Sequence, residues 1–223
     1  MFLRKIGLCI WFVASIFTQV DAQQYLDPEY IKVTRERGAK IVSELNLDNK
    51  EKEEAVTNII AEQYQNLSKI QDKRDVKIEA LKKSKLSEEA QKKKIDKVNA
   101  KAEKSLDKLH KSYIKKLSVH LNEGKIDGVK DGMTYGVLPK TYAAFLEMIP
   151  RLSNEEKEYI FNNLKEAREH AMDGGSSKEK HAWFGKYKGR INNYLSARGY
   201  DLEKERDAWY IRIEEKKKNN SEK

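Results

Sequence analysis

The chain has 223 residues, of which 36% are charged and 39% are hydrophobic, and its formal net charge at pH 7 is +9. This composition, with 11 glycines and only three prolines, is typical of a helical protein with a large solvated surface. The only cysteine, Cys9, excludes an intramolecular disulfide, so packing alone must stabilise the fold.

The first 22 residues have the pattern of a secretory signal peptide. Arg4 and Lys5 precede an apolar run over 8–17 that is too short to span a bilayer, and small residues follow up to Ala22. We expect cleavage after Ala22 and a periplasmic or secreted product. Cys9 lies inside the apolar run, too early for the acceptor of a lipoprotein, and an uncleaved anchor would need a longer apolar run. Outside the cytoplasm there is no genomic DNA, so we expect no nucleic-acid partner.

Three helices are predicted in the first half of the mature chain. Pro28 after Asp27 marks the start of a first helix over about 29–45. Asp48, with Glu51 three residues later, predicts the start of a second, and Ser87 predicts the start of a third. The third helix has the most regular apolar series, with steps of three or four: Ile95, Val98, Ala102, Leu106, Leu109, Tyr113, Leu117 and Leu121. Two long helices joined by a short turn predict an antiparallel hairpin over about 48–121.

The far half of this hairpin is strongly basic. Residues 82–116 contain 13 lysines and five acidic residues, a net charge of +8. Loss of Arg4, Lys5 and Asp21 with the signal peptide lowers the net charge from +9 to +8. The net charge of residues 82–116 therefore equals that of the whole mature chain. Such a surface can attract acidic glycans or, peripherally, anionic lipid headgroups, although many lysine-rich helices are simply solvated.

The second half of the chain predicts short helices after a loop. Gly124, Gly128, Gly132 and Gly136 predict an irregular loop over 122–136. Capping and stop signals then predict helices over about 142–148, 153–172, 178–198 and from 201 onward, before a frayed basic tail at 216–223. The predicted fold is therefore all-α. We expect one domain over 23–215, with the hairpin joined to a compact, aromatic-rich cluster over about 122–215.

No catalytic or metal-binding motif stands out. His110 and His120 are ten residues apart on one helix, about 15 Å along its axis, so they cannot share a metal. Asp127 and Asp131 neighbour glycines, as turn and capping residues do. The chain has no HExxH, GxSxG or phosphate-binding glycine motif. We expect no metal and no cofactor, and the sequence favours a non-catalytic protein while leaving catalysis open.

Aromatic side chains in the second half suggest a binding site. Trp183, Tyr187 and Tyr194 share one side of the 178–198 helix, and Arg190 and Asn193 lie in the same segment. Flat rings beside hydrogen-bond donors suit sugars, which offer apolar C–H faces and many hydroxyls. The competing interpretation is that the rings form part of the core.

Tyr135 and Lys140, from the glycine-rich segment, complete the predicted ligand site. Gly185 and Gly189, four residues apart, predict a groove beside the aromatic stripe.

Two stretches resemble a known family: KDGMTYGVLPKTYAAFLEMIPRL at 130–152 and EAREHAMDGGSSKEKHAWFGKYKGRINNYLSARGYDL at 166–202. They are similar to an uncharacterised family of secreted proteins from polysaccharide-degrading Gram-negative bacteria, a domain of unknown function described as sugar-binding. The resemblance extends over about 30–209. It implies a periplasmic or cell-surface setting near glycan-degrading enzymes, and it brings no catalytic residues with it.

Three hypotheses follow for the function. The first is a secreted, non-catalytic carbohydrate-binding protein that acts in glycan utilisation. The second is a helical interaction or chaperone-like protein that binds an acidic partner through its lysine-rich hairpin. The third is a polysaccharide lyase or hydrolase that uses acids of the glycine-rich segment with a tyrosine or His181.

Overall fold

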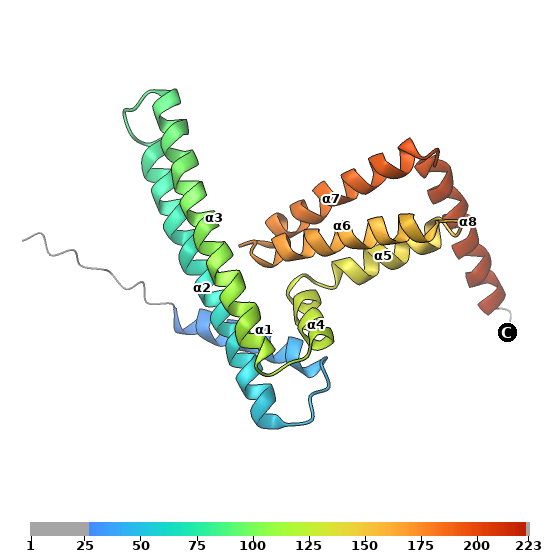
Figure 1. The fold of residues 1–223 in the computed structure, drawn as a ribbon, viewed down its shortest axis with the longest axis horizontal. Coiled ribbons are helices and arrows are strands. Elements are labelled where there is room, and N and C mark those ends of the chain that lie inside the picture. Colours follow the sequence, from blue (N-terminus) through green and yellow to red (C-terminus); the bar gives the residue numbers. More distant parts are fainter. Residues whose placement is uncertain (1–26, 222–223) are drawn as a thin grey trace, which may run out of the picture.

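The computed structural model describes residues 27–221 and is all-α, with no strand in that range (Figure 1). The predicted signal peptide lies outside the described residues. The eight described helices are α1 (Pro28–Ser43), α2 (Lys50–Lys82), α3 (Glu88–Ser118), α4 (Glu123–Met133), α5 (Val137–Met148), α6 (Asn154–Met172), α7 (Ser177–Ala197) and α8 (Leu202–Ser221).

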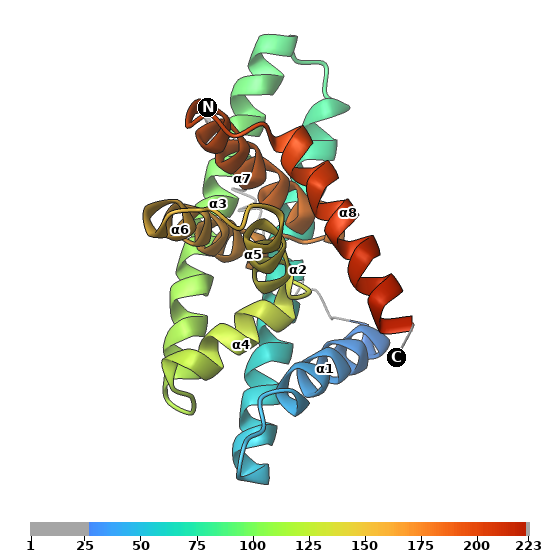
Figure 2. The same ribbon diagram turned by 90° about the vertical axis from the view of Figure 1, so that its right-hand side faces the viewer.

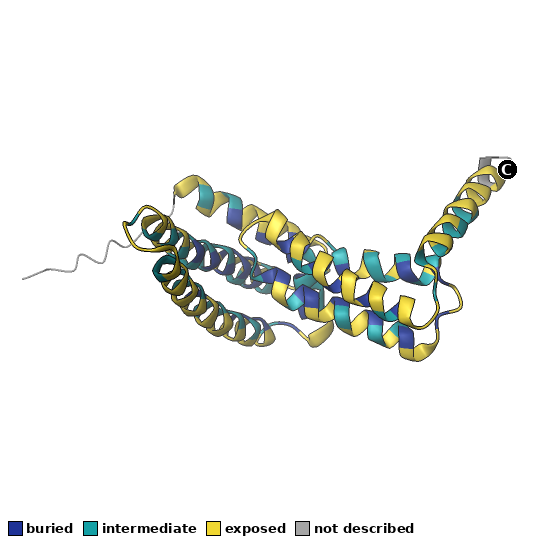
Figure 3. Ribbon diagram, turned by 90° about the horizontal axis from the view of Figure 1, so that it is seen from above, coloured by how far each residue is buried: buried dark blue, intermediate teal, exposed yellow. Residues whose placement is uncertain are grey.

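Helices α2 and α3 form the predicted antiparallel hairpin, which the structure confirms (Figure 1). The side chain of Ser87 caps α3 as expected. Asn49, one residue beyond the expected cap, accepts a hydrogen bond from the Lys52 backbone N–H at the start of α2. From Lys82 to Lys101 no side chain is buried, so the tip of the hairpin projects from the rest of the molecule (Figure 3).

The described helices pack around two hydrophobic cores. The first lies among α1 to α4 and includes Ile60, Leu117 and Val129, all fully buried. The second lies among α5 to α8 and includes Ile160 and Ile191. Helix α4 connects the two, because it packs on α1 and α3 as well as on α5 and α6 (Figure 2).

The predicted loop over 122–136 is wrong, because most of this segment forms helix α4. A Cβ atom on Gly128 would lie 2.8 Å from Leu45 Cδ2, and one on Gly132 would lie 2.8 Å from Ile41 Cγ2. The glycines therefore let α4 approach α1 closely, at a cost in helix propensity of about 1 kcal/mol each. Only the last of the series, Gly136, has a left-handed backbone, with φ of 64°.

Aromatic residues of the second half do not gather in one cluster, contrary to expectation. They form separate ring contacts along the helices, such as Tyr142 with Phe161 and Tyr159 with Tyr194. The buried side chains of this core are mainly aliphatic. The expected end of the last helix also differs, since α8 continues through Lys216 to Ser221.

Candidate functional site

A cleft of about 1390 Å³ lies between the first two helices and the turns that precede α5 and α7. Its walls combine aromatic rings with groups of both charges. Among the lining residues are Tyr30, Arg37 and Lys40 from α1, Tyr64 and Arg74 from α2, Tyr135 and Lys140 from the α4–α5 segment, and Glu179 and Lys180 from α7. The cleft therefore collects side chains that are far apart in the sequence.

The turn between α4 and α5 presents Tyr135 on one wall. Tyr135 and Gly136 both have left-handed backbones, with φ of 61° and 64°. This conformation costs a non-glycine residue roughly 1 kcal/mol. The turn is held by the Gly136 N–H, which donates to Asp131 O at 2.8 Å, and by Lys140 Nζ, which donates to Tyr135 O at 3.1 Å. The Tyr135 residue stays 52% exposed, and its ring meets His181 edge to face.

Tyr64 lies on the α2 side of the cleft, and its ring is near two cations, one from α1 and one from α7. Arg37 Cζ is 5.9 Å from the centre of its ring, and Lys180 Nζ is 5.5 Å away. Burial raises the pKa of Tyr64 to about 12, so its hydroxyl stays protonated at neutral pH.

Lys180 is an unusual lysine because it is only 5% exposed. Its Nζ donates to the backbone oxygen of Met133 at 2.9 Å, which ties the start of α7 to the end of α4. Its stem packs over Gly174, where a Cβ atom would lie 3.1 Å from Lys180 Cγ. Burial lowers the pKa of the Lys180 amine to about 8, because the charged form loses hydration.

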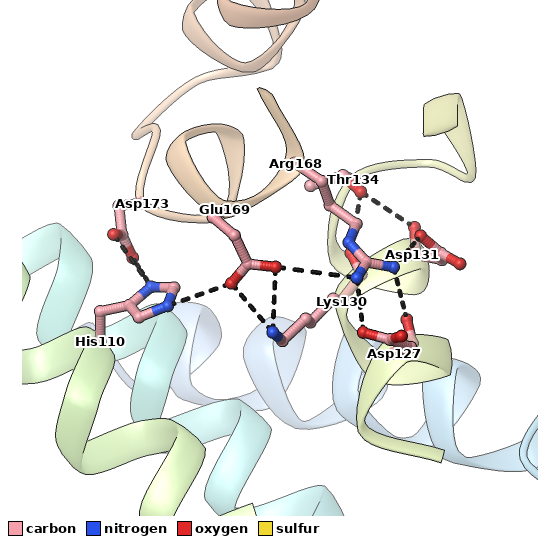
Figure 4. A network of polar contacts seen from close by, with 8 residues as sticks. All are labelled: His110, Asp127, Lys130, Asp131, Thr134, Arg168, Glu169 and Asp173. Atoms are coloured by element: carbon pink, nitrogen blue, oxygen red, sulfur yellow. Dashed lines mark hydrogen bonds and ion pairs between the residues drawn. The ribbon is translucent and has the colours of Figure 1, made fainter. Parts of the chain in front are cut away.

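An ionic network joins the hairpin to the second core beside the cleft (Figure 4). His110, on α3, lies between two carboxylates of α6 and its end: Nε2 is 3.3 Å from Glu169 Oε2, and Nδ1 is 3.2 Å from Asp173 Oδ2. These carboxylates, Asp173 first, raise the pKa of His110 to about 9. Burial opposes ionisation of Glu169, yet the hydrogen bonds from His110 and Lys130 lower its pKa to about 2.

The network continues from α6 to α4. Lys130 Nζ contacts both carboxylate oxygens of Glu169 at 2.9 Å. Arg168 is 3% exposed in its side chain and pairs with Asp127 and with Asp131, the latter at 2.8 Å. The two acids of the glycine-rich segment are therefore partners of an arginine. In the described part of the chain, no group of three or more His, Cys, Asp or Glu residues is arranged to hold a metal ion.

Two of the seven predicted ligand residues, Tyr135 and Lys140, line the cleft. The other five lie on α7 outside its lining: Trp183, Tyr187, Arg190, Asn193 and Tyr194.

Within this α7 group, the rings are already engaged by neighbours. Tyr187 is 2% exposed, and its hydroxyl donates to Glu166 at 2.6 Å, while Arg190 lies over its ring. Trp183 stacks on His170 with ring centres 4.4 Å apart. The structure thus does not bring the two predicted groups together in one site.

The groove predicted beside Gly185 and Gly189 exists as a shallower hollow of about 670 Å³ between α5, α7 and α8, and it too lacks these five residues.

Sequence reasoning missed Arg37, Tyr64 and Lys180. A signal for Lys180 was present: it falls in phase with Phe184, Ile191 and Leu195, the buried face of α7. A lysine in register with an apolar stripe is unusual, because lysine is almost never fully buried without a partner. No comparable local signal marked Arg37 or Tyr64.

Together the fold and the cleft define an all-α protein with a charged, tyrosine-lined cleft between two helical cores. The chain belongs to the family described as protein of unknown function (DUF3826), which it matches over residues 31–215. No curated protein matches the chain significantly. None of the described helices is both long and apolar enough to cross a membrane.

Proposed function

We propose that the protein binds a carbohydrate in the cleft between α1, α2 and the α4–α5 turn, without chemical conversion of the ligand. The observation that carries this proposal is the exposed Tyr135 ring, held by a strained turn opposite Tyr64 with amine and guanidinium donors around it. Tyrosine rings suit the C–H faces of sugars, and the charged donors suit their hydroxyl groups.

The size of the cleft favours an oligosaccharide over a single sugar. Sites for small molecules usually measure about 300–1,000 Å³, whereas this cleft measures about 1390 Å³. The signal-peptide pattern and the family resemblance support a periplasmic or secreted setting in glycan utilisation. In that setting a binding protein would capture fragments released by neighbouring enzymes.

The test is a binding screen of plant and host oligosaccharides with the mature chain, followed by Tyr135→Asn. Asparagine tolerates the left-handed backbone at this position but removes the ring. We expect the affinity to fall about tenfold, the equivalent of about 1.4 kcal/mol. Tyr210→Asn is the matched control, because Tyr210 is 53% exposed but lies on α8, outside the cleft lining. Unchanged affinity in folded Tyr135→Asn would exclude this cleft as the site.

The lysine-rich hairpin supports a second candidate, an interaction with an acidic protein partner. Of the lysines in residues 82–116, only Lys82 and Lys116 form ion pairs with described residues, with Glu79 and Glu62. The other lysines of that segment form no ion pair with described residues, so their charge is available to a partner.

Binding through the hairpin should weaken steeply with salt, because exposed charges are screened over about 10 Å at 0.1 M ionic strength. Replacing Lys92, Lys93 and Lys97 by glutamate should abolish it, as a pull-down at two salt concentrations would measure. Binding that survives both changes would contradict this second function.

The third hypothesis, a lyase or hydrolase, has less support. Its candidate acids Asp127 and Asp131 both pair with the buried Arg168. Shortened product in the oligosaccharide screen would restore it.

A further inference from the structure

We propose that Arg37 and Lys180, which both lie beside the Tyr64 ring, form a subsite for an anionic oxygen group, so that the sugar bound in the cleft carries a carboxylate or a sulfate. This inference rests on the proposed carbohydrate-binding function and adds the class of ligand. It follows from the charge balance around two cations.

The Lys180 amine has no acidic hydrogen-bond partner in the described part of the chain. Its side chain is buried, yet its hydrogen-bond partner is a neutral carbonyl, Met133 O, and it belongs to no ion pair among the described residues. An ammonium group has three donors, and only one is used here. Burial of a cation without a counter-ion costs several kcal/mol in general. An anion in the cleft would supply the missing counter-charge.

Arg37 adds a second positive charge near Tyr64 and Lys180. Arg37 forms no ion pair with described residues. Burial lowers the pKa of the Lys180 amine most, the charge of Asp173 partly opposes this, and the charge of Arg37 lowers the pKa by a smaller amount. Two cations near one ring gain only modest cation–π attraction, roughly 0.5–2 kcal/mol each. An anion between them would be attracted by both.

The carboxylates near Lys180 and Arg37 already have partners. Asp173, whose charge acts on Lys180, is held by His110 at 3.2 Å. Glu179 accepts from the Gly175 N–H at 2.7 Å and lies 3.7 Å from Arg74. Asp131 pairs with Arg168.

Asp75, another acid of the lining, is paired with Arg74 at 2.7 Å, and the two remaining acids of the cleft are farther along the helices. Glu44 is seven residues from Arg37 on α1, and Asp72 is eight residues from Tyr64 on α2. At 1.5 Å per residue these separations are about 10 and 12 Å. Lys40 and Lys140, by contrast, add two more cations to the lining. The part of the cleft around Tyr64 is therefore positive.

Carboxylates and sulfates both fit this subsite. A guanidinium presents paired N–H groups that match two oxygens of either group, and a buried ammonium adds a point charge. The sugar ring that carries the anion would then lie near Tyr64 and Tyr135, which are close enough for Tyr135 to raise the pKa of Tyr64. Because Lys180 must be protonated, affinity for the acidic sugar should fall as the pH rises above about 8.

The experiment compares matched ligand pairs by calorimetry on the mature chain at pH 7. One pair is a uronic-acid trisaccharide and its neutral methyl ester, and the other is a sulfated disaccharide and its desulfated form. We expect at least a tenfold preference for the charged member of one pair, and the pair that shows it distinguishes carboxylate from sulfate. Equal affinity for both members of each pair would overturn the subsite and leave carbohydrate binding intact.

Three variants locate the preference. Lys180→Met and Arg37→Met should each remove most of the preference for the charged ligand, because each lowers the affinity for the charged member much more than the affinity for the neutral member. Lys180→Met keeps roughly the length of the side chain and removes a buried charge that has no ion-pair partner among the described residues, so the protein should remain folded. Arg74→Met is the control inside the same cleft, because Arg74 is already paired with Asp75 at 2.7 Å. An equal loss of this preference in Arg74→Met would contradict the assignment of the subsite to Arg37 and Lys180.

A further measurement separates the subsite from the carbohydrate proposal. With ¹³C-labelled lysine, NMR can follow the ionisation of Lys180, identified by its loss in Lys180→Met, with and without inorganic sulfate. Sulfate should raise the pKa of the Lys180 amine above its value of about 8. If it does so while no oligosaccharide binds, the anion subsite stands and the carbohydrate function fails. No shift with sulfate would overturn the subsite.

Discussion

At the scale of single residues, His110 shows how a local pattern and a tertiary contact differ. The sequence places His110 on α3 ten residues from His120, but the partner of His110, Asp173, lies 63 residues away in the sequence. Such a contact depends on how α6 packs against the hairpin, which no local rule gives. The capping box of Ser153 and Glu156 was predictable and is confirmed, because both partners lie within one turn.

The charge on His110 should make stability depend on pH in a defined direction. Its pKa is raised from 6.5 to about 9, so its contribution is fully present below pH 6.5 and is lost as the pH rises through 9. Glu169 has its pKa lowered from 4.5 to about 2, so its contribution is present above pH 4.5 and is lost as the pH falls towards 2. The network is therefore most stabilising between about pH 4.5 and 6.5.

We predict that His110→Gln lowers the free energy of unfolding by roughly 2 kcal/mol at pH 6 and by much less at pH 10. This figure is reduced from the full value of the pKa shift because the site is partly solvated. Urea denaturation at the two pH values measures the difference, with His120→Gln as the control. A loss of equal size at both values would mean that the ring acts through packing and not through charge.

At the scale of elements, helix α4 explains why glycine spacing was misread. Glycines four residues apart lie close to one face of a helix, since the helical repeat is 3.6 residues. The same series therefore suits a loop or a close helix contact, and only the presence of α1 decides between them. The hairpin was easier, because the apolar series of α3 specifies one buried face whatever lies against it.

Two substitutions on α4 should separate glycine that is needed from glycine that is merely tolerated. Gly132→Ala should cost about 1–3 kcal/mol of stability, because its Cβ would lie 2.8 Å from Ile41 Cγ2. Gly124→Ala should be neutral or stabilising by up to about 1 kcal/mol, since its Cβ would meet only Asn122 Oδ1, at 3.8 Å. Thermal unfolding of both variants tests the pair. Similar effects at the two positions would contradict the close approach of α4 to α1.

At the scale of the whole molecule, the all-α class, the hairpin and all the described helices except α4 followed from composition, caps and periodicity. The packing of the other helices did not, and most of the candidate site depends on that packing. Tyr135 and Lys140 were found because they lie at the end of the glycine-rich segment, where the chain does turn at Gly136 although most of the predicted loop is helix α4. Tyr64 and Lys180 are 116 residues apart, and they meet only because the start of α7 lies near α2 in the folded chain.

Lys180 connects the two hydrophobic cores at the cleft. Its helix belongs to the second core, while its amine is fixed to Met133 and lies over Tyr64, both part of the first. A ligand that bridges these groups would link the two cores at one more place, in addition to α4, the ionic network and Met172 of α6, which is buried in the first core. The affinity of the ligand and the stability of the contact between the two cores would then depend on the same interaction energy.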